Sequence, residues 1–145
     1  MGKVPVWLMQ ETPGFLVNRM QAALMREALA LIDAGVASPR DVDLAVRHGF
    51  GFRYAACGPL LQKEHSGWDI SHKLYQTVFP TLCNSPTPAP VLERLIAAGE
   101  VGEAVRGFVQ WTTETEAAGR SRFNVSMWRA RQVLTEDNET DLQWR

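Results

Sequence analysis

The segment from Pro13 to about Ala34 constrains the fold most, because it holds the longest uninterrupted helical pattern in the chain. Thr12 is a suitable N-cap, Pro13 suits the first helical position, and Gly35 supplies the stop. The apolar arc of this helix is broad, which predicts burial against more than one neighbour. Its apolar residues, at helical spacing, are Leu16, Val17, Met20, Leu24, Met25, Ala28, Leu31 and Ile32. Polar residues on the opposite side are Asn18, Arg19, Arg26 and Asp33.

Length and composition indicate one compact domain with its own core, since the chain has 145 residues, 46% of them hydrophobic and 21% charged. The formal net charge is -1, and the basic residues are mostly scattered, so neither nucleic acid nor an anionic membrane is an expected partner. No apolar run approaches the roughly 20 residues of a membrane helix, and the N-terminus has no signal-peptide pattern. We therefore expect a soluble cytoplasmic protein.

A second helix start lies at residues 38–43, where Ser38 is the expected cap, Pro39 takes the first position and Asp41 completes a short capping box. This helix is expected to run to about His48 and to be broken by residues 49–53. Further helices are expected over residues 58–64, 68–79, 91–98 and from Thr113 or Thr115 to about Leu134, with a proline-rich loop at 84–90 and turns around 101–111.

The predicted fold class is therefore all-α, with five to six helices around a long central helix and no Rossmann domain. Residues 1–134 form one helical domain, in which 1–12 are an extended N-terminal arm and 3–9 a short strand or extended piece. Residues 135–145 form a polar, frayed tail. Cys57 and Cys83 fit no metal-ligand spacing; two buried thiols are expected, with a disulfide as the alternative.

Standard catalytic motifs are absent from the sequence: there is no dinucleotide-binding glycine motif, Walker loop or nucleophile elbow. His65 and His72 form the one pair to weigh as metal ligands, with Asp69 or Glu64 as a third ligand. Surface or loop histidines are the favoured interpretation, because Ser66 and Gly67 interrupt the helix between them. His48 is expected at a helix C-terminus, where it suits the helix dipole.

Asn18 is the candidate for chemistry, because a side-chain amide on the first turns of an apolar helix must find polar partners or lose about 1–3 kcal/mol. The structural alternative is an Asn that faces water or bonds a nearby loop. The functional alternative is an amide that hydrogen-bonds a substrate oxygen.

Several sequence motifs in order resemble the C-terminal domain of the 3-hydroxyacyl-CoA dehydrogenase family. They are Pro-Gly-Phe-Leu-Val-Asn-Arg at 13–19, Ser-Pro-Arg-Asp-Val-Asp at 38–43, Gly-Phe-Gly at 49–51, Gly-Pro-Leu at 58–60, Gly-Trp-Asp at 67–69 and Gly-Phe-Val-Gln-Trp at 107–111. The resemblance holds from about residue 2 to residue 111. The long helix after Trp111 is more similar to the lambda-crystallin-like branch, which includes L-gulonate and carnitine dehydrogenases, than to the fatty-acid enzymes.

This resemblance implies that the chain forms one wall of a substrate cleft and dimerises, whereas NAD binds a separate Rossmann domain in the same or another chain. It implies that Asn18 is a catalytic residue and that Arg19, Gly58, Pro59 and Leu60 contact substrate. The family's catalytic Ser, His and Glu belong to the Rossmann domain, so we expect this chain to bind no cofactor and to be inactive alone. Leu60 and Val109 replace aromatic residues of the family pattern, and residues 52–57 add bulk near the expected pocket, so the substrate stays open between acyl-CoA, sugar acid and carnitine.

Two alternatives remain besides the dehydrogenase domain. One is a non-catalytic helical dimerisation module, which the broad apolar arc of the first helix supports. The other is a helical small-molecule binder unrelated to dehydrogenases, for which the sequence has no signature.

Overall fold

The computed structural model describes residues 5–100, 107–109 and 112–135, and within these ranges every regular element is helical. The expected all-α fold is confirmed. The α-helices of the described chain are α1 (Phe15–Asp33), α2 (Pro39–Leu44), α3 (Pro59–Ser66), α4 (Trp68–Val78), α5 (Pro90–Ala97) and α6 (Thr113–Thr135). Short segments of other helical types are η1 (Ala45–Phe50), η2 (Gly51–Ala55) and η3 (Phe79–Thr81).

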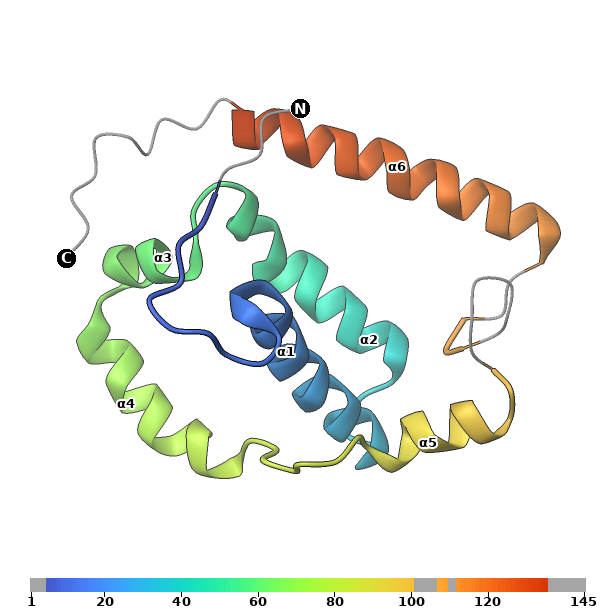
Figure 1. Ribbon diagram of the computed structural model, residues 1–145, viewed down its shortest axis with the longest axis horizontal. Coiled ribbons are helices and arrows are strands. Elements are labelled where there is room, and N and C mark those ends of the chain that lie inside the picture. Colours follow the sequence, from blue (N-terminus) through green and yellow to red (C-terminus); the bar gives the residue numbers. More distant parts are fainter. Residues whose placement is uncertain (1–4, 101–106, 110–111, 136–145) are drawn as a thin grey trace.

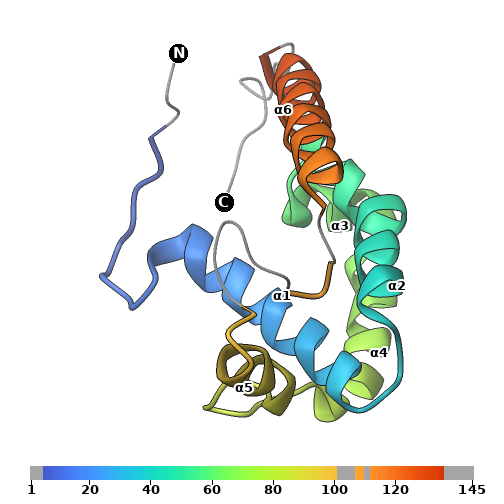
Figure 2. The same ribbon diagram turned by 90° about the vertical axis from the view of Figure 1, so that its right-hand side faces the viewer.

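Helix α1 lies in the middle of the molecule, and the other helices lie around it (Figure 1). In the turned view, α2, α3, α4 and α6 lie on one side of α1, whereas its N-terminal half projects away from them (Figure 2). The N-terminal arm continues outward from that end (Figure 2). The end of α1 that carries the family-like motif is therefore the part least covered by its own chain.

The start of α1 differs from the sequence prediction. Thr12 and Pro13 precede the helix, Gly14 is the N-cap, and the backbone N–H of Phe15 donates to the carbonyl of Thr12 at 2.9 Å. Gly14 has φ 80°, a left-handed conformation that favours glycine over other residues. The tight turn at Gly14 thus displaces the predicted N-cap at Thr12 and begins the helix two residues later than Pro13.

Other helix ends confirm the predicted caps. The Ser38 side chain accepts a hydrogen bond from the backbone N–H of Asp41 at 3.1 Å, and Pro39 takes the first turn of α2. At the end of α1, the N–H of Val36 donates to the carbonyl of Leu31 at 2.9 Å, which closes the helix next to Gly35. These local signals were readable because each depends on residues within five positions of one another.

The expected break at residues 49–53 is wrong. The chain continues from α2 into the π-helix η1 and then the 3-10 helix η2, so the path stays helical to Ala55. The N–H of Gly51 donates to the carbonyl of Val46, five residues back. A Cβ at position 51 would lie 2.8 Å from that same oxygen. Glycine at 51 therefore permits the change of helix type rather than ending the helix.

Two contacts connect α1 to distant parts of the chain, and a third joins α4 to η3. The Glu27 carboxylate accepts a hydrogen bond from the backbone N–H of Cys83 at 2.7 Å, and the Asp33 carboxylate pairs with Arg94 of α5 at 2.7 Å. The rings of Tyr75 and Phe79 stack with centroids 4.6 Å apart. The Arg94–Asp33 pair is solvent-exposed on the arginine side, so its contribution is about 0–1 kcal/mol.

The expected compact core is absent from the described chain, where Ala28 and Leu29 are the buried apolar residues, each 8% exposed. Most of the predicted apolar arc of α1 is exposed, including Leu16, Met20 and Leu24. The physical reason is the ring-like arrangement, in which α1 contacts α2 and α5 but no helix covers its outer side.

The thiols of Cys57 and Cys83 are free and half-buried, which excludes the disulfide in this structure and leaves them less buried than expected. Within the described residues, no helix is long and apolar enough to cross a membrane. The described part of the arm, residues 5–12, contains no strand. Predictions for residues 1–4, 101–106, 110–111 and the tail 136–145 lie outside the described residues.

We expect Glu27→Ala to lower the free energy of unfolding by about 1–3 kcal/mol, because it leaves the half-buried Cys83 N–H without its charged acceptor. Glu27→Gln keeps an acceptor oxygen and should cost less. Urea unfolding followed by circular dichroism measures both. Arg26→Ala, at the adjacent exposed position of α1, is the matched control; equal losses for Glu27→Ala and Arg26→Ala would contradict the role of this bond.

Gly51→Ala should destabilise the η1–η2 junction by about 1–3 kcal/mol, because the added Cβ meets the Val46 carbonyl and forces the backbone to shift. Gly49→Ala is the control, since nothing lies within 4 Å of a Cβ at position 49. Urea unfolding compares the two variants. An unfolding midpoint for Gly51→Ala equal to that of Gly49→Ala would show that the close approach at 51 is unimportant.

Candidate functional site

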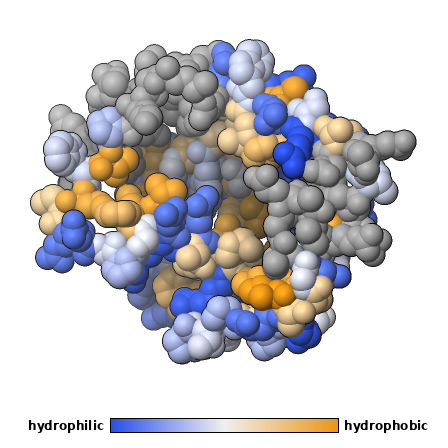
Figure 3. Space-filling view, turned by 45° about the vertical axis from the view of Figure 1, so that its right-hand side comes forward, coloured by the Kyte–Doolittle hydropathy of each residue, from blue (hydrophilic) through white to orange (hydrophobic). Residues whose placement is uncertain are grey.

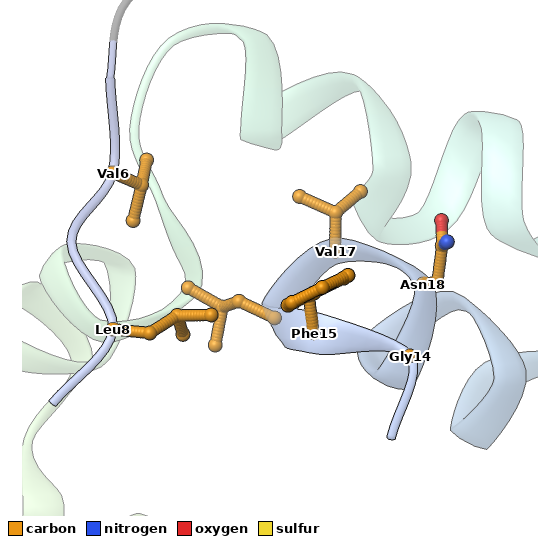
Figure 4. Close-up of a pocket in the computed structure, with 7 residues that line it drawn as sticks. Val6, Leu8, Gly14, Phe15, Val17 and Asn18 are labelled. Atoms are coloured by element: carbon orange, nitrogen blue, oxygen red, sulfur yellow. The ribbon is translucent and has the colours of Figure 1, made fainter. Parts of the chain in front are cut away.

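A shallow pocket of about 380 Å³ lies between the N-terminal arm and the first turn of α1 (Figure 4). The arm contributes Val6 and Leu8, whose side chains point toward the helix (Figure 4). The helix start contributes Gly14, Phe15, Leu16, Val17 and Asn18. The lining is thus apolar except for one amide and contains no charged side chain, which suits a pocket for an uncharged part of a ligand.

The backbone at the mouth of this pocket is strained. Phe15 has φ 48°, a positive value for a residue with a side chain, directly after Gly14 at φ 80°. Such a conformation costs roughly 1–3 kcal/mol, and strained residues cluster at functional sites. A Cβ at position 14 would also lie 3.7 Å from the Asn18 Cβ and 3.4 Å from the Arg19 backbone nitrogen. The turn therefore brings the backbone of residue 14 close to the Asn18 side of the helix.

Asn18 lies on the first turn of α1, beyond Phe15 and Val17 as seen from the arm (Figure 4). The residue is exposed, and within the described chain its side-chain amide has no hydrogen-bonding partner. In this chain alone the amide therefore faces water, as the structural interpretation expected. Exposure also leaves both of its donor hydrogens and its oxygen open to a ligand.

The four other predicted site residues do not line this pocket. Arg19 is exposed and follows Asn18 on α1. Gly58 is the N-cap of α3, with Pro59 in its first turn and Leu60 58% exposed beside it. Their contacts with substrate stay predictions, because this structure contains no ligand and α3 belongs to a different part of the molecule from the start of α1 (Figure 1).

Histidine and acidic residues are dispersed in the described chain, where no group of three or more His, Cys, Asp or Glu residues is placed to hold a metal ion. His65 and His72 are both exposed, on α3 and α4. Glu64, one of the acidic residues weighed as a third ligand, instead accepts a hydrogen bond from the Trp68 indole at 2.8 Å. Glu64 and Trp68 therefore connect α3 to α4.

Sequence reasoning missed Val6 and Leu8 as pocket residues. They belong to the segment that the sequence predicts only as an extended N-terminal arm. The available signal was their spacing of two, because alternate residues of an extended chain point to the same side. Trp7 between them is 89% exposed, which fits that alternation.

Comparison with known proteins identifies the family. Residues 14–111 match the model of the 3-hydroxyacyl-CoA dehydrogenase, C-terminal domain. The chain is 33% identical over 118 residues to 5-formyl-3-hydroxy-2-methylpyridine 4-carboxylate 5-dehydrogenase of Mesorhizobium japonicum, covering 81% of this chain and 38% of that protein. It is 36% identical over 113 residues to an L-carnitine dehydrogenase of Pseudomonas sp, and this match covers 71% of this chain and 35% of that protein. It is 46% identical over 59 residues to lambda-crystallin of Oryctolagus cuniculus, and this match covers 41% of this chain and 18% of that protein.

The arrangement of the helices also matches a solved structure. The crystal structure of a 5-formyl-3-hydroxy-2-methylpyridine 4-carboxylic acid 5-dehydrogenase, described as an NAD+ dependent dismutase, aligns with a TM-score of 0.81 and 30% identity. The alignment covers 92% of this chain and 42% of that chain. The chain thus spans well under half the length of these relatives. Taken with the matched residues 14–111, these findings show that the chain belongs to the 3-hydroxyacyl-CoA dehydrogenase family, through its C-terminal domain.

Proposed function

We propose that this chain is the substrate-cleft and dimerisation domain of an NAD-dependent 3-hydroxyacyl-CoA dehydrogenase or a related 3-hydroxy acid dehydrogenase. The family match over residues 14–111 carries the proposal, together with the pocket at the start of α1. NAD binds a Rossmann domain in the same or another chain, and this chain alone transfers no hydride.

Asn18 supplies this domain's part of the chemistry. Its amide donates a hydrogen bond to the substrate oxygen that changes between hydroxyl and carbonyl, and so orients the reacting carbon toward the nicotinamide. The base that removes the hydroxyl proton and the nicotinamide that accepts the hydride belong to the other wall of the cleft. The exposed Asn18 amide and the apolar lining of the pocket support this assignment of roles to the two walls.

The names of the relatives bear on the substrate. Carnitine and 5-formyl-3-hydroxy-2-methylpyridine 4-carboxylate are both small molecules that carry a carboxylate, and neither is an acyl-CoA. We infer that a small hydroxy acid is the substrate class, with acyl-CoA as the alternative. The pocket lining contains no basic side chain, so the carboxylate of such a substrate binds outside it.

A second candidate function is a stand-alone helical dimerisation module without catalysis. The exposed apolar residues on the outer side of α1 favour it, because they form an association surface whether or not a cofactor domain is present.

Asn18→Ala should lower NAD reduction by about 10²-fold or more when the chain is combined with an NAD-binding domain, the scale for losing one positioned hydrogen-bond donor. The N-terminal part of the Mesorhizobium relative that this chain does not match can be fused ahead of residue 1. Formation of NADH at 340 nm is then measured with L-carnitine, a sugar acid and a 3-hydroxyacyl-CoA as alternative substrates.

Gln21→Ala is the matched control, an exposed amide on the next turn of α1. Its activity should stay within about twofold of the unmodified fusion, as expected for a surface substitution. Equal activity of Asn18→Ala and Gln21→Ala in an active fusion would exclude the catalytic role of Asn18. A dimeric chain that gives no activity with any of these substrates would favour the non-catalytic module.

A further inference from the structure

Exposed apolar side chains do not by themselves mark a ligand site on this chain, because they occur on each α-helix of the described residues. Apolar residues also surround a central hollow of the molecule (Figure 3). The start of α1 differs, because an apolar pocket, a side-chain amide and a strained backbone meet there. The N-terminal arm forms one side of this pocket, and the proposed role of Asn18 leaves the arm without a function.

Leu8 is the arm residue that packs toward the helix start. It is half-buried and points toward α1 (Figure 4), whereas Trp7 before it is 89% exposed and Met9 after it is 97% exposed. Within the described chain, no backbone hydrogen bond joins residues 5–11 to α1. The separation of the arm from the helix, and so the width of the pocket, therefore depends on the packing of Leu8 and on the turn at Gly14.

Val6 and Leu8 lie at the end of the pocket that is remote from Asn18. Both point from the arm toward the helix, while Asn18 lies beyond Phe15 and Val17 (Figure 4). A substrate whose reacting oxygen is bound by the Asn18 amide therefore extends past Phe15 toward the arm. Its far end meets the side chains of Val6 and Leu8, which take no part in the chemistry.

The lining of the pocket specifies the chemistry of that far end. It contains no charged side chain, so it favours an uncharged alkyl group over a carboxylate. Quaternary ammonium groups are bound by cages of aromatic rings, whereas Phe15 is the one aromatic residue that lines this pocket in the described chain. The part of a 3-hydroxy acid that suits the pocket is therefore its hydrocarbon end, with the carboxylate outside.

The volume of the pocket limits the length of that hydrocarbon end. At about 30 Å³ for each water-sized group, the pocket volume of about 380 Å³ holds at most roughly a dozen methyl-sized groups. Because the pocket is shallow, only part of this volume is in contact with its lining. A short alkyl chain therefore fits, whereas a long-chain acyl group extends beyond the pocket.

We propose that the pocket binds the alkyl end of a short-chain 3-hydroxy acid, and that Val6 and Leu8 of the arm limit the length of the alkyl chain that is accepted. This inference rests on the proposed function and names the substrate class at the same site. Asn18 positions the reacting oxygen, and the arm selects the substrate. Truncation of an arm side chain therefore changes which substrate is preferred and leaves the Asn18 amide in place.

The fusion with an NAD-binding domain tests this proposal with 3-hydroxy acids of four, six, eight and ten carbons, as free acids and as coenzyme A thioesters. Both series present the same alkyl end, so their comparison shows which head group the cleft takes. Leu8→Ala should raise the ratio of kcat/KM for the eight-carbon substrate to kcat/KM for the four-carbon substrate by about 10-fold or more, the scale for added methylene groups in an apolar pocket. Leu8→Phe should lower this ratio by a similar factor.

Trp7→Ala is the matched control, because Trp7 is 89% exposed and lies on the other side of the arm. Its ratio should stay within about twofold of that of the unmodified fusion. If the Leu8 variants lose helical content by circular dichroism, Val6→Ala decides, with the same direction of change expected as for Leu8→Ala. Val6 is 65% exposed, so its truncation disturbs little packing.

An unchanged ratio in both Leu8→Ala and Val6→Ala, in an active fusion, would overturn this inference and leave the role of Asn18 in place. An equal loss of kcat/KM at every chain length would also overturn it, because that result places the arm against the NAD-binding domain instead of the substrate. Activity with L-carnitine but with neither alkyl series would overturn this inference alone. A fusion that is inactive with every substrate contradicts the proposed function, and this inference with it.

Discussion

The exposed apolar side of α1 is the constraint on which the rest of this structure depends. Helix α1 lies among the other helices, yet its own chain buries only Ala28 and Leu29 among the described apolar residues. Hydrophobic burial stabilises proteins by roughly 25 cal/mol per Å² of apolar surface, so the exposed side chains of Leu16, Met20 and Leu24 are an unmet driving force for burial. The contacts that remain, such as Glu27 with the Cys83 backbone, position helices without forming a core. In the proposed function, association supplies the missing burial.

The candidate site follows the same logic, because in the proposed function this chain supplies one wall of a cleft. The left-handed turn at Gly14 and Phe15 sets the direction in which α1 leaves the arm, and this turn forms the apolar pocket with Val6 and Leu8. Asn18 is exposed beside that pocket. An amide in bulk water gains little from a hydrogen bond to a ligand, whereas the same bond in a closed, water-poor cleft is stronger. The proposed role of Asn18 therefore depends on a second surface.

Local features were predictable where they depend on neighbouring residues. The cap at Ser38 and Asp41, the stop next to Gly35 and the start of α3 at Pro59 all involve groups a few positions apart. The ordered motifs also identified the family, because several spacings must match at once. The rule that glycine ends a helix did not predict the π-helix η1. Gly51 instead accommodates the Val46 carbonyl, which lies close only because of the three-dimensional path of the chain.

The sequence by itself determined the all-α class, most helix boundaries, the family and the candidate amide at Asn18, because these depend on short-range spacing and composition. It also showed that α1 has more apolar surface than one neighbour buries. Only the tertiary structure decided that this surface is left open, that the arm joins α1 in forming the pocket, and that α6 lies at the edge of the molecule. The reason is physical: periodicity specifies which residues need burial, but the arrangement of the helices determines whether the chain can provide it.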